Sequence, residues 1–315
     1  MSHVESRSSA PVGPAPLTPE PLPENIVSIQ PGNGIICRLE QAWGRLRRGY
    51  LKRIRPAYVA RMASLRIGSD EGAPHEVLDP RDLKFIRNRC DCHWKPDDDP
   101  FRWRERLPFA RWGLAELLLF TLAAAFVAAI GYYLVGWPAL VLPAAFAALV
   151  VYFFRDPTRT VPATVGTVVS PADGRIVEIV SVDYDEFIQG PAVRIGIFLS
   201  VFNVHINRAP LAGRVIRLAY YPGKFLNALL PQSAKENEKL QIDFETPEPP
   251  YRRFWVRQIS GQIARRIVCD LRPGEELAVG QKFGMIKLGS RTEITLAADE
   301  ALEILVERGD RVQAG

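Results

Sequence analysis

Hydrophobic residues are distributed unevenly along the chain, and one long apolar run dominates the pattern. Between residues 114 and 154 the only Asp, Glu, Lys or Arg is Glu116. A membrane-spanning helix needs about 20 apolar residues, so the run is long enough for two helices. Gly136, Trp137 and Pro138 divide it. The pattern therefore predicts a transmembrane helical hairpin within residues 112–154, with helices over 114–135 and 139–154.

Positive charges on both sides of this run predict its orientation. Arginines precede the hairpin and follow it, which is typical of ends that stay on the cytoplasmic side. We expect an inner-membrane protein whose catalytic domain is cytoplasmic. The second apolar segment is short and contains Pro143, so a re-entrant hairpin is an alternative. Burial of both segments in a soluble core is another.

The chain after the hairpin, residues 155–315, has a different pattern of hydrophobic residues. Short runs rich in Val, Ile and aromatic residues are bounded by Gly, Pro or Asp, as in strands, at 166–180, 192–202, 213–221 and 253–261. Because no long helices alternate with them, a doubly wound parallel sheet is disfavoured. The prediction is an α+β, mainly β fold: a β-rich barrel or sandwich behind the hairpin. The polar stretch 232–241 is expected to form a loop or short helix.

The chain before the hairpin divides into two parts. Residues 1–33 are proline-rich and are expected to be a disordered tail. Residues 34–111 form a basic extension, in which apolar residues recur at helical spacing and nine Arg or Lys in 37–66 stand against the single acid Glu40. Pro56 should end or kink this helix. The helix is either an amphipathic helix lying on anionic lipid or a solvated helix packed on the protein. The apolar positions are Leu39, Trp43, Leu46, Tyr50 and Ile54.

Composition adds two constraints. The 315 residues carry a net charge of +5, which favours an anionic partner. Because the chain contains a predicted membrane hairpin, we expect that partner to be lipid. No nucleic-acid partner is expected. The four cysteines are too few for a disulfide scaffold and are expected to be reduced. The stretch CDCHW at 90–94 lacks a second ligand pair at a zinc spacing, so no metal site is predicted.

Three residues of the β-rich part are candidates for chemistry. His205 is the only histidine after residue 154 and therefore the simplest general base near neutral pH. Asp173 lies in the turn sequence SPADGRI, where a structural role is the plainer interpretation. Ser290 follows Gly289 between two strand-like runs. Asp, His and Ser also suit a serine hydrolase, although no G-x-S-x-G elbow is present.

The order of these motifs is more specific than each motif alone. SPADGRI, FLSVFNVHINRAP and KFGMIKLGSRTEI follow an apolar hairpin that ends in YFFRDP. Over about residues 112–315 the chain resembles the short bacterial phosphatidylserine decarboxylases, which depend on a pyruvoyl group. The resemblance does not extend to the first hundred residues.

The resemblance implies a self-processing enzyme. The Ser290 hydroxyl would attack the Gly289 carbonyl, with Asp173 and His205 activating it, and the chain would separate into residues 1–289 and 290–315. The two fragments would stay associated, and Ser290 would become a covalent pyruvoyl group. That cofactor would decarboxylate phosphatidylserine to phosphatidylethanolamine and CO2. Whether the enzyme forms an oligomer is left open.

Arg208 marks a departure from part of the wider family. It stands three positions after His205, where some members have a second histidine, so His205 either serves both processing and turnover or Arg208 binds a substrate anion. Lys287 and Arg291 flank the cleavage site and are expected to be solvated charges at a strand edge. The competing hypothesis from another class is a catalytically inactive β-scaffold that acts as a membrane-tethered binding module.

Overall fold

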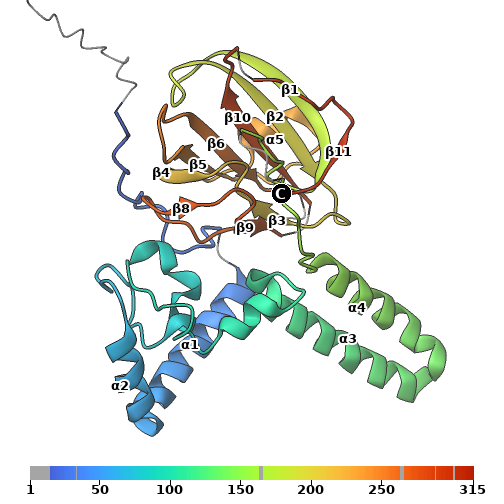
Figure 1. Ribbon diagram of the computed structural model, residues 1–315. Helices are drawn as coiled ribbons and strands as arrows, with labels where there is room; N and C mark the ends of the chain where they lie inside the picture. Colours follow the sequence, from blue (N-terminus) through green and yellow to red (C-terminus); the bar gives the residue numbers. More distant parts are fainter. Residues whose placement is uncertain (1–14, 33, 163–165, 263–265, 288, 301) are drawn as a thin grey trace, which may run out of the picture.

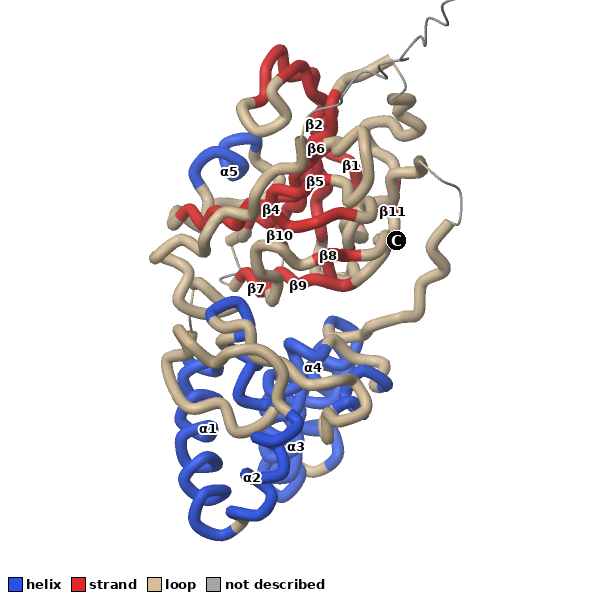
Figure 2. The backbone as a smooth tube through the Cα atoms, turned by 60° about the vertical axis from the view of Figure 1, so that its left-hand side comes forward, coloured by secondary structure: helices blue, strands red, loops and turns tan. Residues whose placement is uncertain are grey.

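A curled β-sheet domain is carried on a helical base in the computed structural model, which describes residues 15–32, 34–162, 166–262, 266–287, 289–300 and 302–315. In Figure 1 the sheets occupy the upper part, the apolar hairpin extends from one side of the base, and the N-terminal helices extend from the other. The same division into a strand-rich part and a helical part is visible after rotation in Figure 2. The structure confirms the predicted mixture of helices and strands, with a β-rich domain.

The main sheet is antiparallel and eight-stranded, in the order β11-β1-β2-β10-β6-β5-β4-β8. It curls into a half-barrel (Figure 1). The strands are β1 (Gly174–Asp185), β2 (Gly190–Leu199), β4 (Gly213–Tyr221), β5 (Lys239–Glu245), β6 (Arg253–Ile259), β8 (Glu276–Leu277), β10 (Ser290–Ala297) and β11 (Arg311–Val312).

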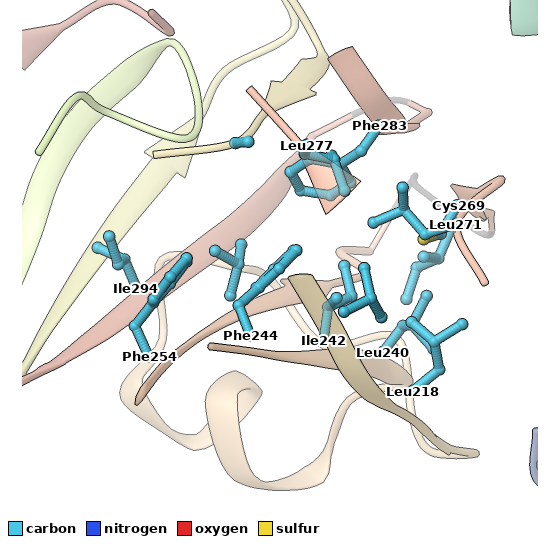
Figure 3. Close-up of a cluster of buried hydrophobic side chains, with 14 of the residues drawn as sticks. Leu218, Leu240, Ile242, Phe244, Phe254, Cys269, Leu271, Leu277, Phe283 and Ile294 are labelled. Carbon is cyan, nitrogen blue, oxygen red and sulfur yellow. The ribbon is translucent and has the colours of Figure 1, made fainter. Parts of the chain in front are cut away.

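A smaller sheet covers the concave side. It has the order β3-β9-β7, with β3 (Ile206–Arg208), β7 (Ile267–Cys269) and β9 (Lys282–Ile286). The main hydrophobic core lies between the two sheets, where Phe244 stacks on Phe254 with ring centroids 5.0 Å apart and Phe283 approaches from β9. Figure 3 shows these side chains converging. The domain is therefore two layers of sheet around one core.

Strand β5 corrects one prediction. The sequence indicated a loop or short helix over 232–241, and the helix α5 (Pro231–Glu236) is present, but residues 239–245 form a central strand. The polar side chains of β5 resemble those of a solvated segment, but they are buried and paired. Asp243 accepts a hydrogen bond from Arg217 Nε at 2.6 Å, and Glu245 pairs with Arg214.

The apolar run forms two helices as predicted, α3 (Leu114–Val135) and α4 (Val141–Phe153), joined by the short turn η5 (Trp137–Leu140). Phe120 and Phe146 meet edge to face between them. By length and composition, the described residues contain one helix that is long and apolar enough to cross a membrane, at Arg111–Val135, and the second apolar helix, Trp137–Phe153, is shorter. The helical hairpin exists; that it spans a membrane stays a prediction.

The N-terminal region differs from the expectation in part. Residues 1–14 lie outside the described residues. Residues 15–32 are not a disordered tail: Glu20 N–H donates to Ile216 O at 2.8 Å, and Ile26 and Ile29 are buried. The apolar residues between the prolines were enough to pack this segment along the sheet domain.

The basic extension begins with two helices, α1 (Ile35–Ile54) and α2 (Pro56–Leu65), so the chain turns at Pro56 as predicted. Short 3-10 turns follow at Pro80–Phe85, Arg87–Arg89, Arg102–Arg106 and Arg111–Gly113. Cys37, Cys90 and Cys92 are free thiols buried in a small core with Met62 and Trp94. Burial raises the pKa of Cys92 to about 11. Both cysteines of CDCHW are part of this buried cluster.

Candidate active site

His205 is held at the junction of the two sheets. It lies in the connection between β2 and β3 and is 1% exposed. Its Nδ1 lies 2.9 Å from the carbonyl oxygen of Asn203. Because a carbonyl only accepts, Nδ1 must carry the proton, and Nε2 is left as the basic nitrogen. The imidazole also packs against Phe153 of α4, with ring centroids 4.4 Å apart.

This environment keeps the imidazole neutral. Burial lowers the pKa of His205 to about 4, and the charge of Arg155 acts in the same direction. The hydrogen bond to Asn203 opposes the shift. At neutral pH, His205 is therefore a neutral base whose Nε2 can accept a proton or a hydrogen bond, rather than an imidazolium ion.

Nε2 of His205 points to the predicted cleavage site. The N–H of Gly289 donates to it at 3.3 Å. The chain leaves the small sheet with β9 and enters the main sheet at Ser290, the first residue of β10. Gly289 lies between the two sheets with φ +64, a conformation that favours glycine. The structure thus brings His205, Gly289 and Ser290 together.

The Gly289 carbonyl has its own close neighbour. A Cβ added to Gly261 would lie 2.2 Å from Gly289 O, so only a glycine leaves room for this oxygen. Gly261 follows β6, the strand that pairs with β10. Gly261 could not be singled out from the sequence, because one glycine after a strand carries no distinguishing pattern.

The Ser290 hydroxyl is buried and makes no hydrogen bond to the described residues. Ser290 is 0% exposed, and its Oγ has no hydrogen-bond partner among the described residues. Leaving a buried hydroxyl unsatisfied costs about 1–3 kcal/mol, so such a group calls for an explanation. A nucleophile that must attack the preceding carbonyl needs this freedom, and the strand pairing of Ser290 with Leu199 of β2 fixes its backbone.

Asp173 lies beside the C-terminal segment, apart from His205 and Ser290. Its Oδ2 accepts from Arg159 at 2.7 Å, and its Oδ1 accepts from the backbone N–H of Ala314 at 2.8 Å. Among the described contacts none joins it to His205 or Ser290. Asp173 therefore holds the C-terminal segment against the turn before β1.

Arg208 is also engaged elsewhere. Its guanidinium donates to Gly280 O at 3.1 Å and to Asp156 Oδ1 at 3.4 Å. Arg208 is 8% exposed and lies on β3, two residues beyond the strand's start at Ile206. Its contacts connect the small sheet to the segment that follows the hairpin.

Lys287 and Arg291 are not the solvated strand-edge charges expected from the sequence. Lys287 is 6% exposed and donates to Glu116 Oε1 at 2.5 Å, where Arg266 also donates at 3.2 Å. Arg291 is 2% exposed and donates through Nε to Glu293 at 2.9 Å. The expectation failed because both side chains are buried against carboxylates: Lys287 pairs with the distant Glu116, and Arg291 pairs with Glu293 of its own strand and with Glu178 of β1.

The pairing of Glu116 has a structural consequence. Glu116 lies in the first turn of α3, whereas Lys287 lies just before the predicted cleavage site. Burial lowers the pKa of Lys287, and Glu116 opposes that shift. The sole acid of the apolar run therefore ties the root of the hairpin to the chain beside Gly289. The sequence signal was present, since an isolated acid in an apolar run needs a partner, but the partner was not predictable.

The remaining candidates for metal chemistry are weak. Among the described residues, no group of three or more His, Cys, Asp or Glu side chains is placed to hold a metal ion. His93 of CDCHW is exposed, and its Nδ1 lies 3.1 Å from Asp91 O.

Comparisons with known proteins agree on one family. A family model described as phosphatidylserine decarboxylase matches residues 146–315. The chain is 55% identical over 233 residues to a phosphatidylserine decarboxylase proenzyme of Rhodopirellula baltica, which covers 74% of this chain and 96% of that protein. Proteins with the same name from Desulfotalea psychrophila and Carboxydothermus hydrogenoformans are 45% and 46% identical, over 53% of this chain and 77% and 76% of theirs. The first match covers more residues than lie between 112 and the C-terminus, so the similarity extends into the segment expected to be an unrelated extension.

Proposed function

Since the chain belongs to the phosphatidylserine decarboxylase family, we propose that it cleaves itself between Gly289 and Ser290 and decarboxylates phosphatidylserine with a pyruvoyl group made from Ser290. The observation that carries the proposal is the convergence of a neutral His205, the Gly289 backbone and an unpartnered Ser290 hydroxyl. A serine hydrolase or an inactive scaffold would leave the family relationship unexplained.

The self-cleavage begins with an attack by Ser290. Its Oγ bonds to the Gly289 carbonyl carbon while the base takes the hydroxyl proton. The base then delivers that proton to the Ser290 nitrogen as the Gly289–Ser290 C–N bond breaks, so that an ester replaces the amide and Ser290 gains a free amine. Loss of the Ser290 α-proton then expels the Gly289 carboxylate and leaves a dehydroalanine. Its enamine tautomerises to an imine, and water releases ammonia to leave the pyruvoyl group. Residues 1–289 and 290–315 remain as separate chains.

His205 is the base in this sequence. Its Nδ1 proton is committed to Asn203 O, so Nε2 is the nitrogen that accepts a proton. The Gly289 N–H already points at Nε2, which places the base one residue from the nucleophile. A neutral imidazole at pH 7 is ready to accept the Ser290 proton without first losing one of its own.

The residues around Ser290 also fit a pyruvoyl group at the start of β10. When formed, that group supplies the electron sink that decarboxylation of an amino acid requires. The chain's own residues hold its strand: β10 lies between β2 and β6 and stays paired with both along its length. Arg291, buried against Glu293 and Glu178, holds the first residues of the new fragment in place. Strand pairing therefore keeps the fragments associated after cleavage.

Asp173 and Arg208 have supporting roles in the proposal. Asp173 positions the turn before β1 through Arg159 and the C-terminal segment. Its role as the carboxylate that activates Ser290 remains a prediction from the family. Arg208 as a contact for a substrate anion likewise remains a prediction, which would require it to leave Asp156.

Membrane location is part of the proposal. The α3–α4 hairpin exposes large apolar side chains such as Phe126, Leu134 and Leu142, which are 67%, 70% and 81% exposed. Lipid is the environment in which such a surface is stable. The root of the hairpin packs on the site through Phe153, so insertion places the sheet domain against the membrane, on the side expected to be cytoplasmic, where phosphatidylserine and other membrane lipids are in reach.

Turnover by the purified protein tests this function. Detergent-solubilised enzyme should convert phosphatidylserine to phosphatidylethanolamine with release of CO2, and phenylhydrazine, which reacts with the pyruvoyl carbonyl, should abolish that conversion. Ser290→Ala should show no conversion. Thr292→Ser, a change two residues along the same strand, should retain it. Activity in Ser290→Ala would rule out Ser290 as the source of the cofactor.

A further inference from the structure

Helix α1 carries an apolar stripe that the other described residues leave largely exposed. Ile35, Leu39, Trp43, Leu46, Tyr50 and Ile54 are each at least 54% exposed. They recur at spacings of three or four and lie on one face. The opposite face, with Cys37 and Leu51, is the one packed on the protein. The helix is therefore packed on the protein through that face and exposes its apolar stripe, so contact of the stripe with lipid stays a prediction.

The charges beside this stripe select the kind of partner. Arg38, Arg45 and Arg53 are exposed and have no ion pair within the part of the chain that the structure describes. Glu40, the acid of this helix, is already paired with Lys84. A second copy of the stripe would bring like charges together, which is destabilising. An anionic surface would neutralise them.

The stripe is also continuous with the root of the hairpin. An open groove of about 930 Å3 lies between α1 and α3. Leu39 and Trp43 line one wall, Leu114 and Leu118 line the other, and Arg48 and Arg111 are among the basic residues that border it. In Figure 1 the two helices start close together below the sheets and then diverge. If α3 enters a membrane at this point, the first part of α1 lies close to the lipid headgroups.

We propose that α1 is an in-plane lipid-binding helix whose exposed stripe inserts into an anionic lipid leaflet beside the hairpin. Apolar side chains below and arginines at headgroup level are the features of interfacial helices. The inference goes beyond the decarboxylase chemistry, and it rests on the proposed membrane entry of α3. It gives residues 35–54 a role in holding the enzyme on the anionic surface that contains its substrate.

Site-directed spin labelling of the full chain tests the proposal. The native cysteines are buried, so a nitroxide attaches selectively at Leu46→Cys in the stripe, or at Arg45→Cys as the matched control on the same helix. The labelled proteins are placed in phosphatidylcholine vesicles with or without phosphatidylglycerol. Collisions with oxygen report insertion into lipid, and collisions with a water-soluble nickel chelate report exposure.

The expected result is that the Leu46→Cys label is shielded from nickel and accessible to oxygen in anionic vesicles, whereas the Arg45→Cys label stays accessible to nickel. Replacing Arg38, Arg45 and Arg53 with Gln should weaken insertion of the Leu46→Cys label on the order of a hundredfold, since each cation near an anionic surface contributes roughly fivefold. Cleavage at Gly289 should be unchanged in all variants, which separates this proposal from the proposed function.

Three results would overturn the proposal. Equal nickel access at both labelled positions would show that α1 does not insert. Equal insertion with and without phosphatidylglycerol would remove the requirement for anionic lipid. Spin–spin broadening between Leu46→Cys labels would show that the stripe pairs with a second copy instead.

Discussion

The buried imidazole of His205 makes a quantitative prediction about pH. Its pKa is lowered from 6.5 to about 4 by burial, so the folded protein binds fewer protons at this site than the unfolded chain between those values. Stability must therefore fall as pH falls through this window. At about 1.4 kcal/mol for each tenfold change in the proton equilibrium, the loss approaches about 3 kcal/mol by pH 4. Above pH 6.5 this contribution is complete.

The perturbation is His205→Gln in the uncleaved Ser290→Ala background. Glutamine keeps an acceptor near the Gly289 N–H but cannot take up a proton. Denaturant unfolding in detergent, followed from pH 7 to pH 4, should give a free energy of unfolding that falls less steeply for the double variant, with the difference approaching about 3 kcal/mol. Parallel pH profiles for the two proteins would refute the buried neutral imidazole.

The same pKa governs self-cleavage. A histidine with an ordinary pKa of 6.5 would be about 90% protonated at pH 5.5, and cleavage by it would slow about tenfold relative to pH 7.5. With a pKa of about 4, His205 remains neutral at both values. The rate at which newly made precursor is cleaved should therefore be nearly equal at pH 5.5 and pH 7.5, and a tenfold decline would contradict the assignment.

Two further predictions concern the surroundings of the cleavage site. Gly261→Ala should slow cleavage, followed on gels, at least tenfold, because its Cβ would lie 2.2 Å from Gly289 O. The control Gly190→Ala should be cleaved normally, because a Cβ added there would have no atom within 4 Å. Normal cleavage of Gly261→Ala would show that the position of the Gly289 carbonyl is not critical. Glu116→Ala should lower the free energy of unfolding by about 3–5 kcal/mol by leaving Lys287 buried without its carboxylate, and adding Lys287→Met should recover part of the loss. No recovery would mean that the two residues are not coupled.

The sequence predicted the elements that depend on local pattern. The bounds of α3, the turn at Pro56 and strand β4 follow from hydrophobic spacing and from proline. Strand β5 was missed because its alternating polar residues are paired with arginines of neighbouring strands, which local pattern does not contain. The packed segment 15–32 was missed because a few apolar residues among prolines gain their burial only from the folded sheet.

The site was predicted in its residue types more than in its geometry. His205, Gly289 and Ser290 were identified and lie together. That Asp173 faces Arg159 and the C-terminal segment, and that Gly261 packs on the Gly289 carbonyl, depend on strand pairings between distant segments. The roles of Asp173 and Arg208 therefore stay predictions.

Intact-mass spectrometry of the purified protein tests the central claim most directly. The wild-type chain should appear as two species, residues 1–289 and a fragment of residues 290–315 whose first residue has the mass of a pyruvoyl group instead of serine. Ser290→Ala should appear as a single chain of about 35.2 kDa. A single uncleaved wild-type chain, or cleavage after Gly289 in Ser290→Ala, would contradict self-cleavage by Ser290.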